Sequence, residues 1–201
     1  MAKNFFENKD YNTPVFETNN FVVVPSLGSL MEGWLLIVPK TYYLNFSQLS
    51  AELIAEVKVI IQHLQARFLP LFVNDRYVLF EHGPADLLSK AGCGVDYAHL
   101  HWVPCDFDLL KGATKFLGLD FAWQEIEGLS DVAKKAKLSQ DYLYLQDQEG
   151  RHFLTSQPIV PSQTFRQVIA HYLNQPERFD WKSYDGAEHI RSFYKKLTLI
   201  D

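Results

Sequence analysis

The chain lacks several features that would place it in a specialised class of protein. Its 201 residues include only two cysteines, Cys93 and Cys105, which is too few for a disulfide framework or a cysteine-rich metal site. No apolar run approaches the length of a membrane span, and residues 1–8 lack a long apolar segment, so we expect no signal peptide. The net charge of −5 provides no general attraction for nucleic acid or membrane surfaces. We therefore expect a cytoplasmic protein whose partners include neither nucleic acid nor a membrane.

What remains is an ordinary globular composition, 47% hydrophobic and 21% charged, with clear local patterns. Apolar runs at residues 21–24, 34–38 and 77–81 predict strands. Ser50 is a candidate N-cap for a helix that reaches Phe68, because apolar residues follow it at helical spacing. Farther along, the sequence predicts strands at 121–126, 142–145 and 152–155 and helices at 130–138, 162–174 and 187–197.

These elements predict a fold of the α+β class. The strand at 77–81 and the strand that follows it are expected to pair in antiparallel fashion, so the helix would pack on an antiparallel sheet. We place this module at residues 1–105. Residues 106–201 are expected to form a mixed α/β C-terminal extension that packs on the module.

His99 and His101 are the residues that most strongly suggest chemistry. On a strand, residues two apart point to the same face, so both imidazoles and the phenol of Tyr97 would lie side by side. Imidazole has an unperturbed pKa near neutrality, so it serves as nucleophile, acid, base or metal ligand. Gly92 and Gly94 in the preceding turn allow the backbone to approach an anionic ligand closely. The alternative is a pair of surface histidines on a half-exposed strand.

The sequence around this pair resembles the histidine triad superfamily. The family motif is His-φ-His-φ-His-φ-φ, where φ is apolar, and the run Tyr-Ala-His-Leu-His-Trp-Val at residues 97–103 matches it at every position except the first. The resemblance extends upstream to about Phe16 and ends near Pro104, so it covers about half of the chain. No site of the family is carried over to the extension.

The resemblance implies a nucleotidyl hydrolase that acts on dinucleoside polyphosphates or nucleoside phosphoramidates. His99 occupies the position of the family's nucleophile, which attacks the α-phosphorus and forms a covalent nucleotidyl-histidine. His101 would contact the phosphate or support charge in the transition state. The family needs no metal for this step, so no cofactor is expected. Family members commonly form homodimers, and the same assembly is expected here.

Several substrate-binding positions depart from the family pattern. Tyr97 replaces the first motif histidine, and its phenol can still donate a hydrogen bond to a phosphate. Tyr42 stands where many members have another phosphate-side histidine, and Ser26 stands near the usual ribose-binding aspartate. Cys93 lies near the position of a phosphate-contacting glutamine. His82 follows the third strand, where it is either a ligand contact or a turn histidine in solvent.

Two other functions fit the same residues. The histidine pair begins a metal site if His82, Cys93 or Asp96 supplies a third ligand. The departures from the motif also fit a module that binds a nucleotide without turning it over. Arg166, near the start of the helix predicted at 162–174, either approaches a phosphate or is exposed on a capped helix.

Overall fold

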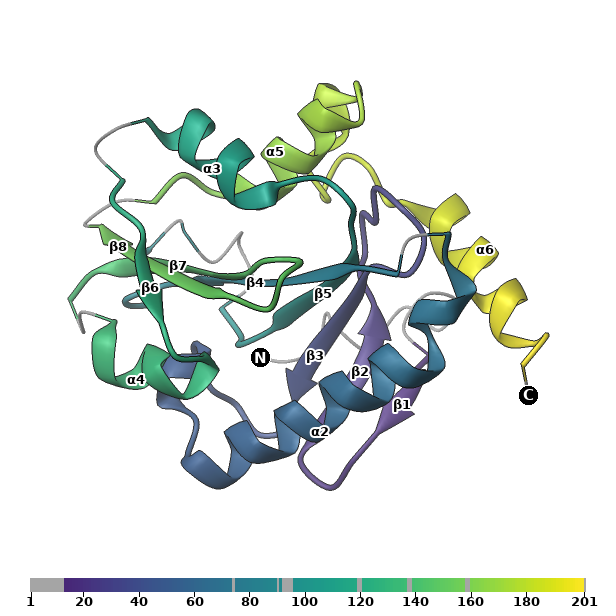
Figure 1. The fold of residues 1–201 in the computed structure, drawn as a ribbon, viewed down its shortest axis with the longest axis horizontal. Helices are drawn as coiled ribbons and strands as arrows, with labels where there is room; N and C mark the ends of the chain where they lie inside the picture. Colours follow the sequence, from purple (N-terminus) through teal and green to yellow (C-terminus); the bar gives the residue numbers. More distant parts are fainter. Residues whose placement is uncertain are drawn as a thin grey trace.

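A single antiparallel sheet forms the centre of the protein, with helices on both of its faces (Figure 1). Among the described residues the sheet has eight strands in the order β1-β2-β3-β5-β4-β7-β8-β6. The expected α+β class with an antiparallel sheet is therefore confirmed. The computed structural model describes residues 13–73, 75–89, 91, 96–118, 121–136, 139–157 and 160–200.

The strands come from both halves of the chain. The sheet joins the two halves of the chain where β4 pairs with β7. It therefore includes strands from both sides of the predicted domain boundary at residue 105, and that boundary stays a prediction. The strands are β1 (Phe16–Glu17), β2 (Phe21–Pro25), β3 (Leu35–Pro39), β4 (Tyr77–Gly83), β5 (Leu100–Pro104), β6 (Gln124–Ile126), β7 (Asp141–Gln146) and β8 (His152–Gln157).

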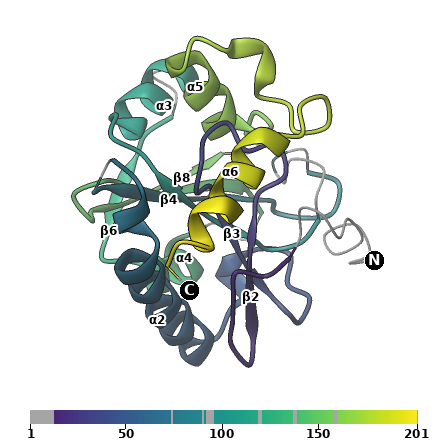
Figure 2. The same cartoon turned by 90° about the vertical axis from the view of Figure 1, so that its right-hand side faces the viewer.

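The helices lie in two layers, and the view in Figure 2 shows the same arrangement from the side. α3 and α5 cover one face of the sheet, whereas α2 and α4 cover the other. No helix among the described residues is both long and apolar enough to cross a membrane. The helices are α2 (Ala51–Arg67), α3 (Leu109–Leu117), α4 (Val132–Lys135), α5 (Thr164–Tyr172) and α6 (Ala187–Leu197), with short 3-10 turns at η1 (Phe46–Gln48), η2 (Leu69–Leu71), η3 (Leu129–Asp131) and η4 (Pro176–Arg178).

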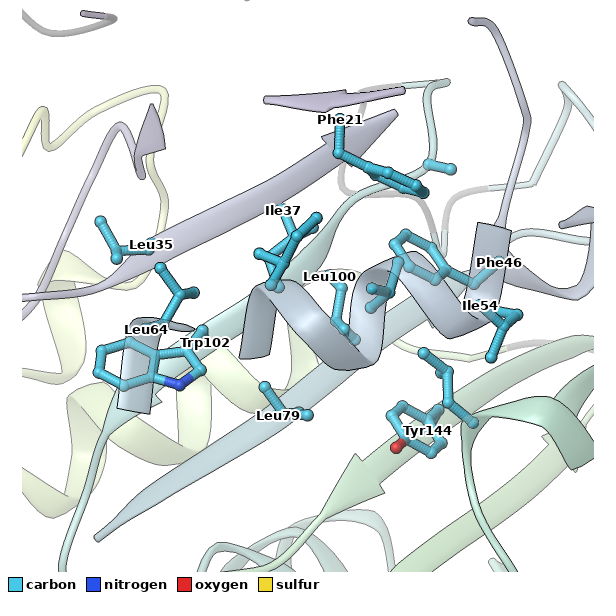
Figure 3. Close-up of a cluster of buried hydrophobic side chains, with 14 of the residues drawn as sticks. Phe21, Leu35, Ile37, Phe46, Ile54, Leu64, Leu79, Leu100, Trp102 and Tyr144 are labelled. Atoms are coloured by element: carbon cyan, nitrogen blue, oxygen red, sulfur yellow. The ribbon is translucent and has the colours of Figure 1, made fainter. Parts of the chain in front are cut away.

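Local sequence signals explain the α2 face of the sheet. The Ser50 side chain accepts a hydrogen bond from Leu53 N, which confirms the predicted N-cap of α2. The helix buries one stripe, including Ile54 and Leu64, against alternate residues of the central strands (Figure 3). β2 and β3 are buried along their whole length, as their continuous apolar runs predict.

The second half is less regular than its pattern predicts. The strand expected at 121–126 is limited to β6, and the helix expected at 130–138 is divided between η3 and α4. α5 begins at Thr164, two residues later than the predicted start at 162, and Gln163 occupies its N-cap position. Tyr172, the last residue of this helix, is 55% exposed and stacks on Phe107.

Candidate active site

Three histidines gather on the face of the sheet that α5 covers. His99 immediately precedes β5, His101 lies on β5, and His82 lies near the end of the neighbouring β4. The ring centroids of His99 and His101 are 4.9 Å apart, and those of His82 and His101 are 6.3 Å apart. Their exposed fractions are 7% for His99, 4% for His101 and 2% for His82. Both a surface location for the motif pair and a solvent location for His82 are therefore wrong.

The main chain of its own segment orients His99. Its Nδ1 lies 2.8 Å from the carbonyl oxygen of Tyr97. Because a carbonyl oxygen only accepts hydrogen bonds, Nδ1 is the donor and carries the proton. In the neutral ring, Nε2 then carries the lone pair.

His101 is held in the opposite tautomer. The indole Nε1 of Trp34 donates to Nδ1 of His101 over 2.8 Å, and an indole N–H cannot accept. The lone pair of His101 therefore lies on Nδ1, and the proton lies on Nε2. The ring also stacks on Phe80, with centroids 4.4 Å apart and an interplanar angle of 18°. Hydrogen bonding and stacking together fix the orientation of this imidazole.

His82 meets the first turn of α5. The main-chain N–H of Phe165 donates to His82 Nε2 over 3.4 Å, and the Phe165 ring lies 5.2 Å from the imidazole. The proton of the neutral ring is therefore on Nδ1. Among the described residues, this buried nitrogen has no hydrogen-bond partner. A buried donor without a partner is costly, so it marks a position where a ligand would be stabilising.

All three imidazoles are neutral at physiological pH. Burial lowers the pKa of His82 to about 3, with smaller contributions from repulsion by the protonated form of His99 and by Arg166. Burial also holds the pKa of His101 well below its usual range, and His99, His82 and Arg166 add to this effect. The pKa of His99 is lowered by burial as well, although its hydrogen bond to Tyr97 acts in the opposite direction. A neutral imidazole has one nitrogen with a lone pair and one N–H donor, whereas an imidazolium ion has two N–H donors and no lone pair.

The other predicted substrate-binding residues have different surroundings. Tyr97 packs against apolar residues of β2 and β3, and its hydroxyl donates to the carbonyl oxygen of Pro39 over 2.8 Å. Tyr42 is 52% exposed and its ring meets that of Tyr97 edge to face. The buried Ser26 hydroxyl donates to the carbonyl oxygen of Leu27. Cys93 lies outside the described residues. The structure thus joins the three histidines in one cluster, to which Tyr97 contributes its carbonyl group.

The C-terminal half supplies an arginine beside the cluster. Arg166 is only 2% exposed, so the alternative of an exposed arginine is wrong. Its Nε donates to Phe179 O over 2.7 Å and its Nη2 donates to Gly28 O, while the guanidinium lies 5.0 Å from the Trp34 ring centroid. Gly28 adopts a φ of +72°, and a Cβ there would lie 2.7 Å from this guanidinium. The glycine therefore permits the close approach.

The sequence interpretation assigned no role to Trp34 or Glu81. Trp34 was only the first residue of a predicted apolar strand. Glu81 was only the last residue of the strand predicted at 77–81. A single acidic residue at the end of an apolar strand is nevertheless a signal of a buried polar contact. Glu81 accepts hydrogen bonds from Phe46 N over 2.8 Å and from the Tyr142 hydroxyl over 2.6 Å, on the α2 face of the sheet.

Metal coordination was the alternative reading of the histidine pair. Within the part of the chain that the structure describes, no three side chains of His, Cys, Asp or Glu are arranged to hold a metal ion. The proton on Nε2 of His101 also makes that atom a donor instead of a ligand.

Comparisons with known proteins give partial likenesses to solved structures. No family model and no curated protein matches the chain. A solved structure of a hypothetical histidine triad nucleotide-binding protein from Sulfolobus tokodaii is 19% identical, with a TM-score of 0.38, over 47% of this chain and 62% of that one. A Hit-like protein involved in cell-cycle regulation from Bartonella henselae, solved with an unknown ligand, is 17% identical, with a TM-score of 0.39, over 46% of this chain and 68% of that one. The chain thus spans less than two thirds of the first of these structures.

Proposed function

We propose that this protein is a nucleotidyl hydrolase that works through a covalent intermediate on His99. The observation that carries the proposal is the pair of adjacent imidazoles in opposite tautomers. His99 has its proton on Nδ1 and its lone pair on Nε2, whereas His101 has its proton on Nε2. One ring is therefore prepared to attack phosphorus, and the other to donate a hydrogen bond to a phosphate oxygen.

The proposed reaction has two displacement steps. The Nε2 lone pair of His99 forms a bond to the α-phosphorus, and the bond from phosphorus to the leaving oxygen or nitrogen breaks. The leaving group departs with the electron pair, a phosphate as its anion and an amine with a proton taken from solvent. Water then attacks the same phosphorus and gives a proton to the solvent. The bond to His99 breaks, which releases a nucleoside monophosphate and restores the neutral imidazole.

His82 and Arg166 support an anionic ligand at this place. The unsatisfied Nδ1–H of His82 would gain a partner in a phosphate oxygen. The charge of Arg166, which helps to disfavour protonation of His82 and His101, favours a bound anion through the same positive potential.

The tyrosine in the first motif position is compatible with catalysis in this arrangement. The group that orients His99 is the main-chain carbonyl of residue 97, and every amino acid supplies one. Replacing the first motif histidine by Tyr97 therefore leaves the orientation of His99 intact. Tyr42, Ser26 and Cys93 remain proposed substrate contacts that set ligand preference.

The proposal includes a nucleotide as ligand, with dinucleoside polyphosphates and nucleoside phosphoramidates as the substrate classes. A homodimer and a cytoplasmic location belong to it as well, the former from the family resemblance and the latter from composition. Analytical ultracentrifugation and cell fractionation test these two parts separately from the chemistry.

The covalent intermediate provides the decisive test. Wild-type protein is mixed with diadenosine tetraphosphate labelled at the α-phosphorus, or with adenosine phosphoramidate, and quenched on the millisecond scale. We expect an acid-labile, base-stable adduct on His99, and a loss of turnover of about 10³-fold or more in His99→Ala. His171→Ala, which alters an exposed histidine of α5, is the matched control and retains full activity. Tight nucleotide binding with neither adduct nor product would instead identify a binding module without turnover.

A further inference from the structure

Trp34 immediately precedes β3 and is 1% exposed. Its indole N–H reaches across the strand pair to His101 Nδ1, and its ring meets the His101 ring edge to face at 5.8 Å. The guanidinium of Arg166 also lies 5.0 Å from the centroid of the indole ring. Trp34 thus contacts both the arginine of the C-terminal half and the histidine of the motif.

The chemistry of this contact allows only one form of the imidazole. The indole nitrogen is a donor and never an acceptor, so Nδ1 of His101 must keep its lone pair. Protonation of Nδ1 would place two N–H groups against each other and break the bond. Rotation of the ring by 180° would replace Nδ1 by a C–H group and leave a buried indole N–H unsatisfied.

The surrounding charges act in the same direction. His99 precedes His101 on the same segment, His82 faces it from β4, and Arg166 acts on it from α5. Each of these groups disfavours a positive charge on His101. The bond from Trp34 therefore agrees with the electrostatic surroundings instead of opposing them.

We propose that Trp34 is a positioning residue that holds His101 in the neutral Nε2–H tautomer, so that this ring always offers an N–H donor to the phosphate. The tautomer of His101 follows from the hydrogen-bond geometry alone. Its role in turnover rests on the proposed hydrolase function. His101 consequently acts as a fixed hydrogen-bond donor and does not exchange protons during the reaction.

The tautomer is measured directly by two-bond ¹H–¹⁵N NMR on protein labelled in histidine. In the wild type we expect His101 to show a protonated Nε2 and a bare Nδ1, with no titration over the pH range in which the protein stays folded. Trp34→Phe removes the N–H while keeping an aromatic ring. It should mix the two tautomers of His101 or give the ring a measurable pKa.

Trp102→Phe is the matched control. Trp102 lies next to His101 but on the α2 face, and among the described residues its indole N–H has no hydrogen-bond partner. This variant should leave the His101 signals unchanged. If Trp34→Phe does not fold, benzothienylalanine at position 34 replaces the N–H by sulfur at nearly constant volume and tests the same bond.

Turnover gives the second readout. Loss of one buried hydrogen bond predicts a kcat about tenfold lower in Trp34→Phe with little change in KM, together with a new dependence on the titration of His101 at acidic pH. A proton on Nδ1 in the wild type, or identical His101 signals in wild type and Trp34→Phe, would overturn the role of Trp34. Absence of turnover in the wild type would overturn the hydrolase proposal and leave the NMR result standing.

Discussion

Glu81 and His82 are neighbours on β4, yet they belong to opposite faces of the sheet and to different kinds of polar site. Both are almost fully buried. Burial raises the pKa of Glu81 to about 8, against opposing hydrogen bonds from Tyr142 and Phe46, and it lowers the pKa of His82 to about 3. Each side chain is therefore neutral near pH 7.

The two residues differ in how completely their surroundings satisfy them. Each carboxyl oxygen of Glu81 has a hydrogen-bond partner, Phe46 N for one and the Tyr142 hydroxyl for the other. His82 has one long hydrogen bond from Phe165 N and a buried N–H that no described group accepts. The first arrangement is complete within the protein and serves stability. The second lacks an acceptor among the described residues, which is why we propose a functional role for the α5 face.

The largest expected effect is on stability, from removing the carboxyl group. Glu81→Leu leaves the Phe46 N–H and the Tyr142 hydroxyl without their partner, so we expect a loss of about 3 kcal/mol in the free energy of unfolding. Urea unfolding measures this loss. A loss of less than about 1 kcal/mol in the free energy of unfolding would show that the hydrogen bonds of Glu81 with Phe46 and Tyr142 do not stabilise the fold.

The next effect is a pH dependence of stability. The pKa of Glu81 is about 8 in the folded protein against 4.5 for an ordinary carboxyl, so the folded state keeps a proton that the unfolded state loses. This stabilisation is complete below the unfolded value and disappears as the pH rises through about 8. Relative to Glu81→Gln, which does not titrate, the wild type should lose roughly 2 kcal/mol between about pH 6 and about pH 8. Parallel curves for the two proteins would contradict a protonated Glu81.

His82→Phe tests the opposite face. Phenylalanine keeps the ring and removes the unsatisfied N–H, but it also removes the acceptor of the long hydrogen bond from Phe165 N. The two effects oppose each other, so the free energy of unfolding should change by less than about 1 kcal/mol. Affinity for adenosine monophosphate, measured by calorimetry, should fall about tenfold because one buried donor to the phosphate is lost. Unchanged affinity with reduced stability would make His82 a structural residue like Glu81.

The smallest effect is expected at Tyr97. Tyr97→Phe removes a hydrogen bond to Pro39 O, which costs about 1 kcal/mol of stability, and leaves the carbonyl that orients His99 in place. We expect turnover within about twofold of the wild type, measured by product formation at saturating substrate. A loss well beyond that range would show that the phenol itself contacts the phosphate.

Local patterns in the sequence predict the framework of the site well. The strands that became β2 and β3, the N-cap at Ser50 and the last helix at 187–197 all depend on residues close together in sequence. The spacing of His99 and His101 also places their rings on one side, as expected. Short-range periodicity is enough for each of these features.

The chemical state of the histidines could not be predicted in the same way. Trp34 is 67 residues from His101, and Phe165 is 83 residues from His82. Spacing within the motif contains no information about which distant group meets which ring nitrogen. Burial by α5 and the tautomers of His101 and His82 therefore emerge only from the three-dimensional arrangement, whereas His99 takes its tautomer from the carbonyl of Tyr97, two residues away.

The position of β4 in the interior of the sheet has a consequence for synthesis of the chain. β4 pairs with β5 on one side and with β7 on the other, and β7 begins only at Asp141. A nascent chain that has left the ribosome only as far as β5 therefore carries β4 as an open edge, and open apolar edges recruit strands from other molecules. The histidine face is covered later still, when Phe165 and Arg166 have emerged. Protection from aggregation during translation and maturation of the site thus depend on the same late segment.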